Sequence, residues 1–561
     1  MDSMIFINAR IHPQNTPEVF SVMAVCGKKI AYIGNDVAEA KNAVEPEAPV
    51  SDVHGHVIIP AFADSHTHPS CIALTNWRVP LKGNTLEELL EDAAAYCREH
   101  SPEEVPYFFG ESFQLTMFDE NGPRKELLDR YISDRPARLQ DFTDHSCWYN
   151  SLALELMGIR AGRPDPEIVQ GTVADIRRDP DGSPTGWVLE VPDDSLDRIL
   201  YDRIGWHPDL VPTRENMAPF LTFMTRNGIT AVMDAIAEEE SIALFHRMDK
   251  DGTIAFYYDA CILLPEFSAL EETISRANRL KSQYESEHVR IHAVKFFMDG
   301  TNELGDCGSL EPLRTDPTMT DYGNMNMTAE QLTETMIRLN EAGFDLHLHV
   351  VGDRSFRTIC DALEKARAVC GDCWRIEVTA AHCELVHPED MLRPAKLGLR
   401  INWSCHWAGG YFGEKSRDYL GQTRFDSMYD FTRMLASGAQ VSFSSDVFSY
   451  KEAHRAAPFF GIQVSATRRD PEFPLPTERF PGQVRTPASA KLNVHDLIRG
   501  YTKTAADQLR LGDRCGTLEP GKDASFLILS EDPYTADPDR LSGIHPLSTY
   551  FEGKILYTEE S

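Results

Sequence analysis

No stretch of this 561-residue sequence approaches the roughly 20 consecutive apolar residues that span a bilayer. The first residues, Met1 to Ile7, lack the basic start and the long apolar run of a signal peptide, so we expect a cytoplasmic protein. The sequence also lacks a glycine-rich phosphate-binding loop of the P-loop type. A sugar- or nucleotide-binding barrel therefore has no support.

Paired cysteines and excess basic residues are missing as well. The 12 cysteines are scattered, and Cys370 and Cys373 have no second pair nearby, so reduced and mostly buried thiols are expected. The formal net charge of -32 repels polyanions, which excludes nucleic acid and an anionic membrane as partners. This charge says little about a small substrate, because a metal can make a pocket locally positive.

What the sequence does contain is a regular alternation of strands and helices. Short strands at both ends, such as Val22 to Cys26 and Ala524 to Leu529, could complete one small sheet domain together. Between them, apolar strands alternate with amphipathic helices, which predicts a (β/α)8 barrel. The expected barrel strands are Val57 to Phe62, Thr230 to Asp234, Ala255 to Leu264, Val289 to Phe297, Phe344 to Val351, Arg375 to His382, Leu399 to Trp403 and Gln440 to Ser445.

The stretch from about Trp77 to Thr230 is too long for one strand–helix step, and it has patterned segments of its own. We therefore expect an α/β chain whose barrel has a large insertion after the first strand. The predicted organisation is a β-sandwich domain from residues 1–58 and 515–561 around a barrel at 59–514, with the insertion at about 78–228.

Histidines follow the first predicted barrel strand. Side chains two residues apart in a strand share a face, so His66 and His68 can bind the same ion. An isolated pair of this kind is also compatible with two half-exposed histidines. Its position favours a metal site, because barrel enzymes keep their active sites at the C-terminal ends of the strands.

Three other predicted strands end in groups that can bind or activate a metal. They are His349, preceded by His347, then His382, and Asp446. Each alone could be a satisfied polar group of the core, but together they indicate a metal centre at the mouth of a barrel. Lys295 lies inside a very apolar strand, where a charged side chain is costly. Either its side chain extends to the end of the barrel, or the lysine is carbamylated by CO2.

These residues resemble the amidohydrolase superfamily, and within it the third amidohydrolase family, which includes proteins similar to N-substituted formamide deformylases. The resemblance covers nearly the whole chain. It rests on Ala63-Asp64-Ser65-His66-Thr67-His68, Lys295 with Asp299-Gly300, His349-Val350-Val351-Gly352-Asp353-Arg354, His382, Ser445-Asp446, Asp181-Gly182-Ser183-Pro184-Thr185-Gly186 and Leu518-Glu519-Pro520-Gly521-Lys522-Asp523-Ala524.

The resemblance implies a metal-dependent hydrolase of carbon–nitrogen bonds with two divalent ions. Zinc is the expected metal, and manganese or iron would also fit the ligands. His66, His68 and Asp446 would hold the more buried ion, and a carbamylated Lys295 would bridge to a second ion. The second ion would be held by His349 and His382, with His347 as the alternative to His349.

The resemblance also implies catalytic roles for Asp446, as the proton shuttle, and for His406, as a donor to the developing oxyanion. The chain departs from the family at Trp403-Ser404-Cys405-His406, where members often have Gln-Pro-x-His, and at Cys383-Glu384, where Ala-Gln is usual. The segment His145 to Asn150 keeps the family's His, Trp and Asn without the usual Asp-Gly before them.

Substrate-binding candidates are His145, Trp148, Trp403 and Phe448, with Trp407 and Tyr450 as further aromatic side chains near motif ends. Aromatic residues at such positions serve equally as core or lid packing. The expected partner is a small-molecule amide, and the sequence allows a homodimer. The competing functions are a deaminase or cyclic-amide hydrolase on the same barrel, and a catalytically inactive metal-binding regulatory protein.

Overall fold

A computed structural model describes residues 3–83, 85–119, 121–141, 145–170, 174–190, 195–314, 318–410 and 414–559. The chain divides into two compact units. One consists of Met1–Ala73 and Pro212–Ser561, and the other is Leu74–Val211. Among the described residues, no helix combines the length and the apolar character needed to cross a membrane.

Eight parallel strands form the central sheet of the first unit, so the predicted barrel is confirmed. Nearly all of their side chains are buried, because the interior of such a barrel is filled with side chains and helices cover its outside. In spatial order the strands are β7 (Phe62–Thr67), β14 (Ile229–Asp234), β15 (Tyr257–Leu263), β16 (Val289–Phe297), β17 (Asp345–Val350), β18 (Val378–His382), β19 (Arg400–Ser404) and β20 (Val441–Ser444).

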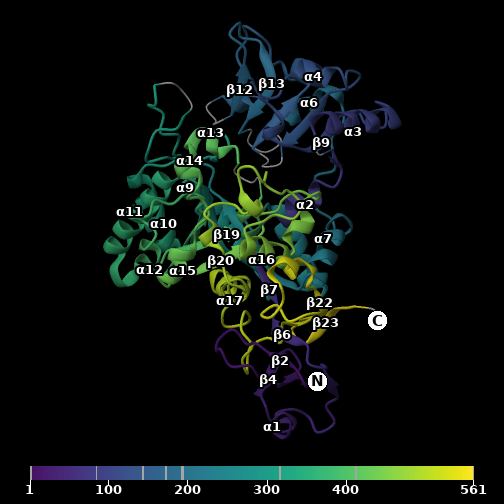
Figure 1. The fold of residues 1–561 in the computed structure, drawn as a ribbon, viewed down its shortest axis with the longest axis vertical. Coiled ribbons are helices and arrows are strands. Elements are labelled where there is room, and N and C mark those ends of the chain that lie inside the picture. The colour runs from purple at the N-terminus through teal and green to yellow at the C-terminus, as the bar shows by residue number, and fades with distance from the viewer. Residues whose placement is uncertain are drawn as a thin grey trace. The chain divides into compact units, whose positions relative to one another are not determined.

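The helices between these strands bury one apolar face each against the barrel, and Figure 1 shows several of them outside β19 and β20. One of these helices begins with a capping box at Thr328, whose side chain accepts from the backbone N–H of Gln331 at 3.2 Å. The longer barrel helices are α7 (Arg214–Arg226), α8 (Glu239–Lys250), α9 (Leu270–Tyr284), α10 (Ala329–Ala342), α11 (Asp353–Cys370) and α16 (Pro458–Thr467). The shorter ones are α12 (Arg393–Leu397), α13 (Ser416–Leu420), α14 (Gln422–Phe425), α15 (Thr432–Ala436), α17 (Val494–Arg499) and α18 (Ala505–Gln508).

The first predicted barrel strand, Val57 to Phe62, was wrong as a single element. Residues Val57–Pro60 form β6, which pairs with β21 (Phe526–Leu529) in another sheet, and the barrel strand begins at Phe62. Pro60 has no N–H to donate, and Ala61 donates to the carbonyl of Ser525 at 3.1 Å while the chain crosses between the sheets. Both strands are buried, so the apolar run gave no sign of the break.

The terminal segments of the chain together build a β-sandwich, and Figure 1 shows the N-terminal strands beside the C-terminal ones. The ring of Phe6 meets that of Phe526 edge to face, with 5.2 Å between centroids, so residues from both ends share one core. The last two strands form an antiparallel hairpin that turns at Glu552-Gly553. The two sheets are β4-β3-β1-β5 and β2-β6-β21-β22-β23, formed by β1 (Ser3–Ile7), β2 (Arg10–Ile11), β3 (Val22–Cys26), β4 (Lys29–Gly34), β5 (Val50–Asp52), β22 (Pro546–Phe551) and β23 (Lys554–Thr558).

The second unit, Leu74–Val211, has a six-stranded sheet and a hydrophobic core of its own. This is the insertion after the first barrel strand that the long interval in the sequence indicated. The sheet order is β12 (Asp175–Arg178), β13 (Pro184–Leu189), β11 (Ser146–Tyr149), β10 (Ala137–Asp141), β9 (Phe108–Phe113) and β8 (Val79–Pro80). Its main helices are α3 (Leu86–Glu99), α5 (Ser151–Met157) and α6 (Ser195–Ile204).

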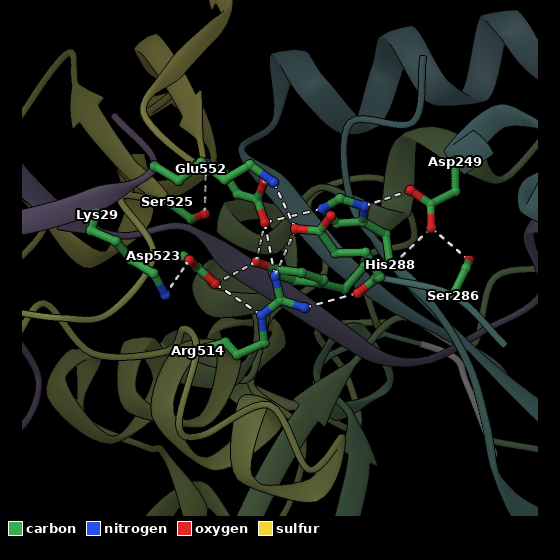
Figure 2. A network of polar contacts seen from close by, with 11 residues as sticks. Lys29, Asp249, Ser286, His288, Arg514, Asp523, Ser525 and Glu552 are labelled. Carbon is green, nitrogen blue, oxygen red and sulfur yellow. Dashed lines mark hydrogen bonds and ion pairs between the residues drawn. The ribbon is translucent and has the colours of Figure 1, made fainter. Parts of the chain in front are cut away.

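A buried polar network joins the C-terminal segments to the N-terminal ends of β15 and β16 (Figure 2). Glu552 accepts hydrogen bonds from His288 Nε2 at 3.0 Å, Arg514 at 2.9 Å and the Tyr257 hydroxyl at 3.0 Å. His288 Nδ1 in turn lies 2.7 Å from the carboxylate of Asp249. Both imidazole nitrogens therefore face carboxylates, which favours the doubly protonated ring.

The replacement Glu552→Gln should destabilise this junction by about 3 kcal/mol, because it removes one partner of a buried ion pair. Burial opposes both charges, but hydrogen bonds lower the pKa of Glu552 to about 2 and raise the pKa of His288. The contribution of the Glu552 carboxylate to the free energy of unfolding is thus present above its unfolded pKa of about 4.5. It is lost only as the pH falls towards 2. The contribution of protonated His288 is present at acidic pH and is lost as the pH rises through its raised pKa.

The thermal midpoint should therefore fall more at pH 5.5 than at pH 8.5 when Glu552→Gln is compared with the unaltered chain by scanning calorimetry. Glu287→Gln is the matched control. Glu287 and Glu552 both pair with Lys28, but the side chain of Glu287 is 55% exposed, against 5% for Glu552. Loss of the Glu287 charge should therefore cost little stability. Equal, small losses for both variants would contradict the role of the network.

Candidate metal centre

The barrel closes where its first and last strands meet, and the closure brings two sequence motifs together. The backbone N–H of Asp446 donates to the carbonyl of His66 at 2.8 Å, and that of His68 donates to the carbonyl of Val447 at 3.1 Å. The His-x-His segment and the aspartate that follows β20 are thus hydrogen bonded to each other, although nearly 400 residues separate them in the sequence.

The carboxylate of Asp446 lies at the centre of a cluster of imidazoles. Its Oδ1 atom is 3.2 Å from Nε2 of both His66 and His68, and its Oδ2 atom is 3.5 Å from Nδ1 of His382. His66, His382 and Asp446 each offer a ligand atom, and these three atoms lie within 4.8 Å of one another. Imidazole nitrogens and a carboxylate oxygen at this spacing fit a divalent transition metal.

Lys295 contacts the same cluster from β16. Its Nζ atom lies 3.2 Å from Nε2 of His66, and the residue is 1% exposed. Burial lowers the pKa of Lys295 to about 8, while Asp446 acts in the opposite direction. A substantial fraction of this amine is therefore neutral at slightly alkaline pH. The neutral amine is the form that reacts with CO2.

His347 and His349 are two residues apart on β17, so their side chains share its inner face. They contact different neighbours. The ring of His349 lies 4.6 Å from that of His382, and its Nε2 atom is 3.1 Å from the carbonyl oxygen of Gly300. A carbonyl can only accept, so Nε2 of His349 carries the hydrogen and Nδ1 offers the lone pair. His347 instead contacts His66, with 3.0 Å between Nε2 of His347 and Nδ1 of His66.

Two buried histidines of the cluster, His66 and His347, favour the neutral form. Burial lowers the pKa of His66 far below its ordinary value, and the nearby positive charge of Lys295 lowers it further. The pKa of His347 is lowered for the same reasons in the same order. Metal ligation needs a neutral imidazole with a free lone pair, so this environment prepares the ring of His66 to bind a cation.

Strained backbone fixes two of the ligand positions. His382 and Cys383 have φ angles of 72° and 47°, and Asp446 has a φ angle of 54°, in the left-handed region that costs non-glycine residues about 1–2 kcal/mol. Asp64 holds the turn before Asp446, since its carboxylate accepts from the Ser445 N–H at 3.0 Å and from the Ser445 hydroxyl at 2.6 Å. No role was expected for Asp64 from the sequence beyond its place in a motif.

Three partly exposed aromatic rings lie against three of the candidate ligands. The ring of Phe448, a predicted substrate-binding residue, meets that of His68 edge to face, with 5.9 Å between centroids. Trp407 stacks on His382, with 5.3 Å between centroids and 21° between planes, and Phe297 lies 4.9 Å from His349. The contact of Phe297 was not anticipated, because Phe297 is the last residue of a strand whose only marked feature was Lys295.

Trp403 packs away from the barrel interior, contrary to its expected place in a substrate pocket. It is fully buried, and its ring lies 4.3 Å from that of Phe431. The next residue towards the N-terminus, Asn402, points inward and accepts from the Ser444 hydroxyl at 2.8 Å. Alternation along β19 therefore turns Trp403 outward into the core between sheet and helices, and we leave it out of the proposed site.

His406 follows β19 in a short 3-10 helix, Cys405–Ala408, and is buried. Its ring lies 6.2 Å from that of Trp407, which stacks on His382. Burial lowers the pKa of His406 well below its ordinary value, and Arg455 lowers it further. His406 is therefore a neutral imidazole, whose N–H can donate a hydrogen bond but not a full positive charge.

His145 and Trp148 belong to the second unit. His145 Nδ1 lies 3.1 Å from the carboxylate of Glu190. Trp148 is fully buried between the rings of Phe113 and Phe118, at 6.0 and 5.3 Å. Its indole is thus part of the packing of that unit rather than an exposed wall, which argues against the substrate contact expected for it.

Comparison with known proteins agrees with this fold and these motifs. The chain is 25% identical to N-substituted formamide deformylase of Arthrobacter pascens, across 99% of this chain and 98% of that protein. It is 24% identical to the putative amidohydrolase YtcJ of Bacillus subtilis (strain 168), across 91% of each chain. The crystal structure of an uncharacterized metal-dependent hydrolase from Pyrococcus horikoshii shares the fold, with a TM-score of 0.67 and 20% identity across 96% of this chain and 99% of that one.

The sequence profile of the Amidohydrolase family matches residues 50–557, which include the whole barrel and the part of the β-sandwich that begins with β5. Membership of this family supports a hydrolase function. The protein therefore belongs to the Amidohydrolase family.

Proposed function

We propose that this protein is a metal-dependent hydrolase that cleaves a carbon–nitrogen bond in an amide, N-formyl or N-acyl compound. The observation that carries the proposal is the convergence of His66, His382 and Asp446, within 4.8 Å of one another, beside the buried Lys295. The similarity to N-substituted formamide deformylase supports the type of bond. At 25% identity it leaves the substrate itself open.

The donor atoms favour two divalent ions, with zinc as the expected metal and manganese or iron as alternatives. His66, His68 and Asp446 would hold one ion. His349, through Nδ1, and His382 would hold the other, and a carbamylated Lys295 would join the two sites. The lowered pKa values of His66 and Lys295 both support this assignment.

Bound divalent ions supply two things that amide hydrolysis lacks in water, namely a water molecule that loses its proton near pH 7 and a polarised carbonyl. The residues of the chain do the rest. Asp446, whose two carboxylate oxygens face three histidines, accepts a proton from the attacking water and passes it to the leaving nitrogen. His406 donates an N–H hydrogen bond to the oxygen that becomes negatively charged.

The proposal is tested by a hydrolysis screen on protein whose metal content has been measured. N-substituted formamides and simple N-acyl amines should release free amine, and a chelator should abolish the activity until metal is restored. Ammonia release from aminated heterocycles, or ring opening of cyclic amides, would instead assign the alternative reaction on the same barrel. Metal binding without turnover of any of these classes would favour a regulatory protein.

A further inference from the structure

His347 is a buried histidine that the proposed metal centre does not use as a ligand. It is 1% exposed and lies on the inner face of β17, opposite Lys295 in the register between β16 and β17. Its ring stands nearly perpendicular to that of His66, with 4.7 Å between centroids and 81° between planes. The two imidazoles meet through one hydrogen bond of 3.0 Å, between Nε2 of His347 and Nδ1 of His66.

The donor and the acceptor of this hydrogen bond can be assigned from the surroundings of the other nitrogen of His66. Nε2 of His66 faces Oδ1 of Asp446 at 3.2 Å and Nζ of Lys295 at 3.2 Å, so this nitrogen points towards the proposed metal. A metal takes its lone pair, which places the hydrogen of the neutral ring on Nδ1. His66 then donates from Nδ1, and Nε2 of His347 accepts.

We propose that His347 is a positioning residue, which holds the imidazole of His66 in the one tautomer and orientation that can bind the metal. The inference rests on the proposed function, because it assigns a partner to one of the proposed ligands.

The geometry distinguishes this role from that of a ligand. Nε2 of His347 is engaged with His66, and Nδ1 has no hydrogen-bond partner among the described residues. No contact brings its nitrogen atoms to the carboxylate of Asp446, whereas His66, His68 and His382 all meet that carboxylate in the described part of the chain. His349, two residues further along the strand, meets the ring of His382 instead.

Two replacements at this position separate the hydrogen bond from the space that the ring fills. His347→Leu removes the acceptor, and His347→Gln keeps an acceptor oxygen in a side chain of similar reach. Partners that orient ligands are worth roughly 10–100-fold in metal affinity, so Leu should weaken zinc binding by that factor and Gln should restore most of it. Zinc affinity and stoichiometry are measured by competition with a chromophoric chelator, and cobalt absorption spectra report the ligand set.

The matched control is His292→Gln, on the neighbouring strand β16. His292 is buried like His347, but its Nδ1 atom contacts the carboxylate of Asp259, at 2.5 Å, and not the metal cluster. This variant should lose thermal stability and keep its zinc affinity. His349→Leu, measured in parallel, should lose binding at one of the two metal positions.

Each outcome decides the inference. Zinc affinity that is unchanged in His347→Leu, or equally weak in the Leu and Gln variants, would overturn the positioning role. Loss of a whole equivalent of metal in His347→Leu, with His349→Leu unaffected, would make His347 the ligand. An unaltered protein that binds no divalent metal would overturn the proposed function and this inference together, whereas the two earlier results leave the proposed function standing.

Discussion

Asp446→Asn should lower the turnover number by about 10²–10⁴-fold while the protein keeps its metal. Asparagine has the same shape as aspartate and still offers an oxygen near Nε2 of His66 and His68. Its amide cannot take the proton of the attacking water, so the step that the carboxylate serves loses its base. Steady-state kinetics on an amide from the screen, together with metal analysis of the same sample, measure both quantities.

The control for this variant is Asp345→Asn. Asp345 is a buried aspartate at the opposite end of the barrel, where it accepts from Arg510 at 2.8 Å, so its loss should reduce stability and leave turnover within a few-fold. Near-normal activity of Asp446→Asn would remove Asp446 from the proton path. Loss of metal from that variant would instead make ligation its main role.

Lys295→Ala should reduce the metal content from about two ions to about one and lower activity by at least about 100-fold, if the carbamate bridges the two positions. Alanine cannot supply the bridging oxygen atoms that carbamylation of the amine would add. Lys295→Met fills the same apolar strand position without an amine, so it separates the loss of the bridge from the loss of packing. The two variants should show the same metal content.

The lowered pKa of Lys295 adds a pH dependence with a definite sign. Only the neutral amine reacts with CO2, and the neutral fraction rises as the pH increases through about 8. At a fixed concentration of dissolved CO2, metal-free protein supplied with zinc should therefore recover activity faster at pH 9 than at pH 6.5. A Lys295→Ala variant that stays active with one equivalent of metal would count against a bridged pair.

The sequence predicted the barrel because its strands are long buried runs, and buried runs are readable without tertiary information. The predicted Val289 to Phe297 and the observed β16 have the same bounds, and the end of the observed β18, His382, was predicted as well. The C-terminal ends of parallel strands meet at one rim. For that reason, polar residues that follow apolar runs can be grouped into one candidate centre from the sequence alone.

Side-chain direction could not be predicted with the same success. Trp403 lies on β19 and turns outward into the core, while Trp407, four residues later, stacks on His382. The apolar run at Val57 to Phe62 hides a change of sheet, because strands buried in two different sheets have the same composition. The relative roles of His347 and His349 also depend on contacts across the barrel.

The sequence by itself therefore determined the order of strands, the family and the residue types that gather at the barrel mouth. Those properties follow from hydrophobic periodicity and from motifs that are local in the chain. Only the tertiary structure decided that His347 contacts His66 and that Asp64 holds the turn before Asp446. Both contacts join residues hundreds of positions apart. The Asp64–Ser445 contact links the first barrel strand to the segment after the last one, and the His347–His66 contact joins the first and fifth strands across the barrel interior, so both depend on the closed barrel.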